Sequence, residues 1–143
     1  MEAKLHEALS ESLIEVLETL AYESPAACDP HASTDWLRAD LEFSGGVQGE
    51  FSLSIESGEA RSLAAALLGQ MPGDLTDDDA LAAVGEIANM VCGGCVSRVA
   101  PNALVQLAAP RAQRSSESET RDALWLEGEA GHLSAHIEMS RPS

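Results

Sequence analysis

The sequence predicts one α+β domain in which helices pack on one face of an antiparallel sheet. In some segments apolar residues recur every three or four positions, which is the spacing of amphipathic helices. In others they alternate strictly with polar residues, as in strands that bury one face. With 143 residues and 45% apolar side chains, the chain is long enough for one core and too short for two. We therefore expect residues 1–143 to form a single domain.

The first element is a helix over residues 4–22. Its apolar stripe is spaced by three or four residues and consists of Leu5, Leu9, Leu13, Val16 and Leu20. Two prolines, Pro25 and Pro30, interrupt the next segment, so residues 23–34 are predicted to form a loop.

A hairpin and a short helix follow. Residues 37–43 and 47–55 alternate apolar and polar side chains, and Ser44-Gly45-Gly46 between them indicates a tight turn. Residues 58–69 then predict a short helix that ends at Gly69.

The longest helix is expected from Thr76 to about Ala100. Thr76 is a good N-cap, and the three aspartates that follow it are favoured by the helix dipole. Pro101 ends the pattern.

The last third of the chain predicts strands separated by a polar loop. A strand is expected at about residues 103–109, and the segment 111–120, rich in serine and glutamate, is interpreted as a mobile loop. A final hairpin pairs residues 122–128 with 131–139.

The composition excludes several classes of function. The formal net charge is −16, with only eight lysines and arginines, which excludes a general nucleic-acid binder and disfavours an acidic membrane surface. No apolar run approaches the roughly 20 residues of a membrane span, and the N-terminus lacks the apolar centre of a secretory signal. The three cysteines, an odd number, suit a reducing compartment, so we expect a cytoplasmic protein.

The helix from Thr76 carries two distinct faces. Its core stripe is Leu81, Val84, Ala88, Val91, Cys95 and Val99. The opposite face centres on Glu86, with Asn89 about one turn away. The surrounding side chains are mostly short: Asp79, Ala82, Ala83, Met90, Gly93 and Ser97.

The predicted helix also contains three glycines, at positions 85, 93 and 94. Each of them reduces the stability of the helix by about 1 kcal/mol relative to alanine. Close approach of another macromolecule would explain them, so we predict a partner-binding face at Ala82, Ala83, Met90, Gly93 and Ser97.

The stretch Val84–Gly93 reads Val-Gly-Glu-Ile-Ala-Asn-Met-Val-Cys-Gly and resembles the Glu-x-x-Asn helix of the CheC/CheX/FliY phosphatases of bacterial chemotaxis. The acidic residues before it, the preceding hairpin and the helix beginning near Ser57 also fit that family's arrangement. The first helix has no asparagine three residues after a glutamate, whereas CheC-type members carry a second motif there. The single motif favours the CheX type, which implies a CheC/CheX-like fold and a homodimer whose sheet continues between subunits.

The resemblance implies a phosphatase that removes the phosphoryl group from the aspartate of a CheY-like receiver domain. Asn89 would orient the attacking water, and Glu86 would pair with the active-site lysine of the receiver. The chain would need no cofactor of its own, because the receiver would supply Mg²⁺. An amide can position water without repelling the phosphoryl oxygens, as a carboxylate at position 89 would.

Several other interpretations stay open from the sequence. The chain could be a non-catalytic adaptor that binds a receiver, or Glu86 and Asn89 could be an exposed pair without a role. Cys92 and Cys95 spell C-x-x-C, but lie far from a helix N-terminus, so small packing residues are favoured over a redox pair or half of a zinc site.

The histidines are not expected to bind a metal ion. His132 and His136 share one face of the last strand, about 13 Å apart, which is too far for one ion. We expect both to be solvated, and neither His6 nor His31 has a supporting pattern.

Overall fold

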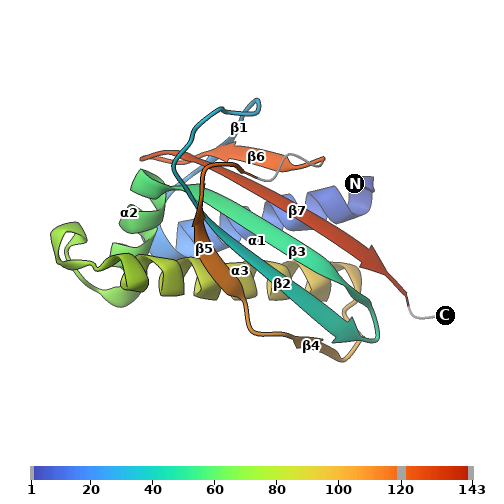
Figure 1. Cartoon of the computed structure of the whole chain (residues 1–143). Coiled ribbons are helices and arrows are strands. Elements are labelled where there is room, and N and C mark those ends of the chain that lie inside the picture. Colours follow the sequence, from blue (N-terminus) through green and yellow to red (C-terminus); the bar gives the residue numbers. More distant parts are fainter. Residues whose placement is uncertain (1, 119–121, 142–143) are drawn as a thin grey trace.

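The computed structural model describes residues 2–118 and 122–141. Three helices cover one face of an antiparallel sheet, so the predicted α+β class is confirmed (Figure 1). The helices are α1 (Ala3–Ala21), α2 (Ser57–Leu68) and α3 (Asp77–Val99), and a 3₁₀ turn, η1 (Pro72–Asp74), precedes α3.

The described residues form a sheet of seven strands with the order β1-β6-β7-β3-β2-β4, and β5 pairs with β2 beside β4. The strands are β1 (Ala26–Ala27), β2 (Trp36–Gly45), β3 (Gln48–Glu56), β4 (Val105–Leu107), β5 (Arg111–Ser115), β6 (Leu124–Glu127) and β7 (His132–Ser140). Both predicted hairpins are present. Leu41 lies opposite Phe51 in the first, and Leu124 lies opposite Ala135 in the second.

The prediction of a mobile loop over residues 111–120 is wrong for its first half. Arg111–Ser115 form β5, which is antiparallel to the first half of β2 and places Ala112 opposite Ala39. The segment lacks apolar alternation because its arginine and glutamine side chains lie at the edge of the sheet, where one flank is solvated. Pairing with the backbone of β2 decides the conformation instead. Residues 119–121 lie outside the described part.

The expected loop 23–34 also contains a short strand that the sequence did not indicate. Ala26 and Ala27 form β1, which pairs with Leu126 and Glu127 of β6. Two alanines carry no periodic pattern, so only the neighbouring strand makes this element.

The core lies between the helices and the inner face of the sheet. Leu9 and Leu13 of α1, Leu53 of β3, Ile87 of α3 and Leu133 of β7 are fully buried in one apolar cluster. Burial of each such side chain contributes about 1.5–3 kcal/mol relative to exposure. The alternation in the strands and the spacing in the helices therefore identified the inner surfaces correctly.

The outer face of the sheet is solvated at one end only. At the other end Ser54, Ser134 and His136 are buried, so the expectation that His136 is solvated is wrong. Trp36 contacts Trp125 edge to face, with ring centroids 5.8 Å apart. The indole N–H of Trp36 donates a hydrogen bond of 2.9 Å to the carbonyl of Ser33, so the loop before β2 packs on this end.

Helix α3 is long and apolar enough to cross a bilayer by length and composition alone, but 56% of its apolar window is buried inside the fold. A central core helix has the same composition, because it is covered on several sides by protein.

Candidate functional site

A capping box fixes the start of α3 and so sets which residues it presents. The hydroxyl of Thr76 accepts a hydrogen bond of 3.0 Å from the backbone N–H of Asp79. The Asp79 carboxylate accepts one of 3.1 Å from the backbone N–H of Thr76. The predicted N-cap is confirmed, and the reciprocal pair satisfies two N–H groups that would otherwise lack a partner.

The glycines of α3 serve packing within the chain. A Cβ atom at Gly94 would overlap the Ser12 hydroxyl of α1, which donates a hydrogen bond of 2.7 Å to the Val91 carbonyl. A Cβ at Gly85 would lie 3.2 Å from the ring of Pro110, in the segment between β4 and β5. The expectation that these glycines admit a partner macromolecule is therefore wrong for Gly85 and Gly94. Each lets a neighbouring segment approach the helix.

Between these two contacts α3 leaves a narrow strip open to solvent. Glu86, Ala82 and Ser97 are exposed, and Gly93 is half-buried. Met90 is 37% exposed, which is unusual for a methionine. We call Ala82, Glu86, Asn89, Met90, Gly93 and Ser97 the open strip of α3.

Ala83 does not belong to the open strip, contrary to the prediction. It is 2% exposed and is part of the core cluster. On a helical wheel it lies about 60° from Glu86, on the same side as Gly94, which packs on α1. A sequence pattern gives that angle but cannot tell that other parts of the fold bury Ala83.

Glu86 extends from the open strip into solvent. Its side chain is exposed, and its carboxylate has no hydrogen bond or ion pair with any residue that the structure describes. The basic residue of α3, Arg98, lies more than three turns away and forms ion pairs with Glu15 and, at 3.6 Å, with Glu11 of α1.

Asn89 is half-buried, and its amide oxygen is an unsatisfied hydrogen-bond acceptor within the described part of the chain. Oδ1 is shielded from solvent and receives no hydrogen bond from any described residue. Leaving a buried acceptor unpaired costs about 1–3 kcal/mol, so such groups are uncommon in folded proteins. Rotation about χ2 exchanges the amide oxygen and nitrogen, so the side chain can present either atom to a partner.

Shallow hollows border the open strip on both sides. One, of 290 Å³, lies between α1 and α3 and is lined by Ser12, Glu15, Val16, Thr19, Met90, Gly94 and Arg98. The other, of 170 Å³, lies between α3 and β4 and includes Gly93, Ser97, Val105 and Leu107. Neither is lined by Glu86 or Asn89, so these two side chains lie on an open helix surface and not in a closed pocket. Sequence reasoning missed Leu107 and Pro110, which frame the strip, because no local pattern reports contacts between distant segments.

The two cysteines of the C-x-x-C sequence are unsuited to redox chemistry. Both are fully buried and free in the fold. Burial raises the pKa of the Cys92 thiol to about 12 and that of the Cys95 thiol to about 11. Because the thiolate is the reactive form, these residues are inert packing side chains at neutral pH.

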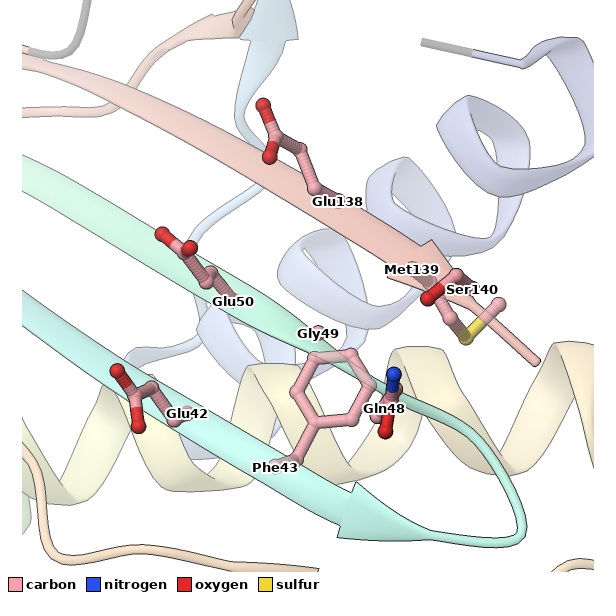
Figure 2. A pocket seen from close by; sticks show the side chains of 8 residues that line it. All are labelled: Glu42, Phe43, Gln48, Gly49, Glu50, Glu138, Met139 and Ser140. Atoms are coloured by element: carbon pink, nitrogen blue, oxygen red, sulfur yellow. The ribbon is translucent and has the colours of Figure 1, made fainter. Parts of the chain in front are cut away.

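A third hollow lies on the solvated end of the outer sheet face and carries a row of acidic residues. Glu42, Glu50 and Glu138 lie opposite one another on β2, β3 and β7, and their carboxylates point to the same side (Figure 2). Like charges in register repel and disfavour an acidic partner. This end of the sheet therefore does not offer a second surface for a phosphorylated protein.

The fold and the capped helix with its exposed glutamate and half-buried asparagine define a CheC/CheX-like protein. The crystal structure of chemotaxis protein CheX from Vibrio vulnificus is similar over 98% of this chain and 100% of its own, with 22% identity and a TM-score of 0.77. That of CheX from Desulfovibrio desulfuricans covers 96% of this chain and 99% of its own, with 21% identity and a TM-score of 0.75.

The chain belongs to the CheX family: the model of the chemotaxis phosphatase CheX matches residues 39–125, which include all of α3. The chain is also similar to the crystal structure of a CheX–CheY–BeF₃–Mg²⁺ complex from Borrelia burgdorferi, at 14% identity and a TM-score of 0.63, over 94% of this chain and 97% of the other. No curated protein matches the chain.

Proposed function

We propose that this protein accelerates loss of the phosphoryl group from the aspartyl-phosphate of a CheY-like receiver domain, and that it acts in the cytoplasm. The proposal rests on two side chains that lie beside each other on an open helix surface. Among the described residues, the amide oxygen of Asn89 receives no hydrogen bond and the carboxylate of Glu86 has no hydrogen bond or ion pair. Membership of the CheX family and the likeness to a CheX–CheY–BeF₃–Mg²⁺ complex support the choice of partner.

The open strip carries little negative charge, as a surface that approaches a phosphoryl group must. The chain carries a net charge of −16, yet the centre of the strip holds a single carboxylate among small or neutral side chains. A second carboxylate there would repel the phosphoryl oxygens. In the proposed complex Glu86 pairs with the active-site lysine of the receiver and thereby sets the orientation of α3.

The chemistry assigned to Asn89 is the positioning of water. Hydrolysis of an acyl phosphate needs a nucleophile in line with the phosphorus and stabilisation of the spreading negative charge. In the proposed complex the Asn89 amide hydrogen-bonds the attacking water, and the receiver provides its own Mg²⁺ for the phosphoryl oxygens. The present chain then needs no resident cofactor for this reaction.

The direct test is the decay of a phosphorylated CheY-like receiver in the presence of Mg²⁺. With this protein the phosphoryl group should disappear faster than in its absence, in proportion to the protein concentration. The alternative function, a non-catalytic adaptor, predicts that the protein binds the phosphorylated receiver but leaves its lifetime unchanged. That outcome would overturn the phosphatase proposal.

Substitution of Glu86 should weaken binding to the receiver more than it lowers the rate of dephosphorylation in the bound complex. Glu86→Lys replaces attraction to the receiver lysine by repulsion, so we expect the protein concentration that gives half-maximal acceleration to rise about tenfold or more. Glu18→Lys, a charge reversal at an exposed position of α1, is the matched control and should change little. If both variants act alike, net charge and not a specific pair governs docking.

We further propose that the protein forms a homodimer by continuation of its sheet. β6 pairs with β7 only over residues 132–135, so the outer edge of β7 beyond them has no partner strand among the described residues. Such an edge readily accepts another strand. Sedimentation should show a dimer that salt stabilises, because Glu138 lies on that edge. A monomer at all concentrations and salt levels would refute the dimer.

A further inference from the structure

A cluster of histidine and glutamate side chains lies at the end of the sheet where β3, β6 and β7 meet. Glu56 is the last residue of β3, His132 is the first of β7, and Glu127 ends β6 directly opposite His132. His31, in the loop before β2, stacks on the ring of His132 with centroids 3.7 Å apart and an angle of 11°. Four segments of the chain therefore contribute to one place.

The donor atoms of this cluster converge. Nδ1 of His132 lies 2.7 Å from Oε1 of Glu56, and Nε2 of His31 lies 3.5 Å from Oε2 of the same carboxylate. One ligand atom from each of His31, Glu56 and His132 lies within 4.8 Å of the other two. The expectation that His132 is a solvated strand residue is thus wrong, since its side chain is only 19% exposed.

We propose that His31, Glu56 and His132 bind a divalent transition-metal ion such as Zn²⁺. Two imidazoles and a carboxylate are a ligand set that zinc uses, at bond lengths of about 2.0–2.2 Å. Bonds of that length place neighbouring donor atoms about 3.3 Å apart, so donor atoms that now lie up to 4.8 Å apart have to approach by as much as about 1.5 Å. The His31 ring also has to turn out of its stack on His132, because an ion bound by both imidazoles lies in the plane of each ring. His31 can supply that movement, because it lies in a loop and its side chain is 38% exposed.

Two further features favour a cation here. Glu127 lies 3.1 Å from Nε2 of His132, so it can accept the N–H of a ring that ligates through Nδ1. A carboxylate behind a ligating histidine fixes its tautomer and raises its basicity. The two carboxylates, Glu56 and Glu127, also balance the charge of one divalent ion.

The backbone preorganises part of the site. The N–H of His132 donates a hydrogen bond of 2.8 Å to Oε1 of Glu56, which ties the carboxylate to the strand that carries the histidine. Three protein ligands leave one position of a tetrahedral shell for a water molecule, and the site is reached by solvent because the His31 side chain is 38% exposed. The cluster is built from the loop before β2 and from β3, β6 and β7, and it uses no residue of the open strip, so its test is independent of phosphatase activity.

The test is titration of the protein with ZnCl₂ by calorimetry, in a Cys28→Ser background. Cys28 is a free, half-buried cysteine that could bind zinc alone, whereas Cys92 and Cys95 are fully buried. One ion should bind per chain. His31→Ala and His132→Ala should each weaken binding at least tenfold, and Glu127→Gln should have a smaller effect. A hundredfold excess of Zn²⁺ over its Kd should raise Tm by several degrees.

His6→Ala is the matched control, because His6 is an exposed histidine on α1 outside the cluster. It should bind zinc like the parent. His31→Ala is the decisive variant, since its loop position leaves the sheet intact, as circular dichroism would verify. Zinc binding that survives both His31→Ala and His132→Ala, or no binding at about 100 µM Zn²⁺, would overturn the proposal.

Discussion

Replacing Asn89 by alanine is expected to remove most of the proposed acceleration of receiver dephosphorylation, a loss of about a hundredfold or more, without weakening the fold. The rate should fall because a water molecule that is no longer held in line must find the reactive orientation by chance. Docking should survive, because Glu86 is unchanged. The measurement is phosphoryl decay at saturating protein concentration.

The same substitution should leave the free energy of unfolding unchanged or raise it by about 1 kcal/mol. The buried Oδ1 of Asn89 has no donor among the described residues, so alanine removes an unsatisfied group. A loss of activity together with equal or greater stability indicates a residue kept for function. A large loss of stability would instead make Asn89 a structural residue.

Two further variants sharpen this test. Asn89→Asp keeps the shape but adds a negative charge facing the phosphoryl group, so it should be as inactive as the alanine variant. Asn102→Ala changes the other asparagine of the chain, an exposed residue just after α3, and should be fully active. If Asn89→Ala dephosphorylates the receiver as fast as the parent protein, the assigned role of the amide is wrong.

The second large expected effect is a dependence of folding stability on pH. It arises from a buried pair of carboxyl groups beneath the turn between β6 and β7. Glu59 and Glu23 are 0% and 2% exposed. Each accepts a hydrogen bond of 2.9 Å from the turn, Glu59 from the N–H of Ala130 and Glu23 from that of Glu129. Oε2 of Glu59 has no donor among the described residues, which a proton shared by the two carboxyl groups would provide.

Burial, followed by the hydrogen bond with Glu23, raises the pKa of Glu59 from 4.5 to about 8. Between these values the folded state binds more protons than the unfolded state, so the stability contributed by this group falls as pH rises from 4.5 to 8 and then levels off. The expected loss is a few kcal/mol, since each unit of pKa difference corresponds to about 1.4 kcal/mol.

The variant Glu59→Gln should remove this pH dependence. The neutral amide keeps an acceptor for Ala130 and offers a donor to Glu23, so the variant should exceed the parent in stability at pH 8–9 by about 1–3 kcal/mol. Urea unfolding at several pH values would show it. Glu7→Gln, at an exposed position of α1, is the control. Parallel pH profiles for parent and Glu59→Gln would contradict the shared proton.

Local patterns were sufficient for most elements and for the residues of the open strip. The capping box at Thr76, the two hairpins and the core stripe of α3 depend on spacing along the chain, and the structure contains all of them. Glu86 and Asn89 could be identified for the same reason, because two residues three apart on a helix share one surface.

Tertiary structure alone decided which of those residues are accessible. Ala83, Gly85 and Gly94 look like part of an exposed, flat surface in the sequence, but all three are covered: Ala83 is buried in the core, Gly94 packs on α1 and Gly85 packs on the segment between β4 and β5. The sequence likewise could not predict that Oδ1 of Asn89 lacks a hydrogen-bond donor among the described residues, because this depends on which segments pack around the side chain.

The sequence by itself determined the fold class, the helix register and the glutamate–asparagine pair, because each follows from interactions between near neighbours along the chain. The tertiary structure decided the edge strand β5, the burial of Glu59 together with Glu23 and the convergence of His31 on His132. These depend on contacts between residues tens of positions apart, and no periodicity in the chain encodes such contacts.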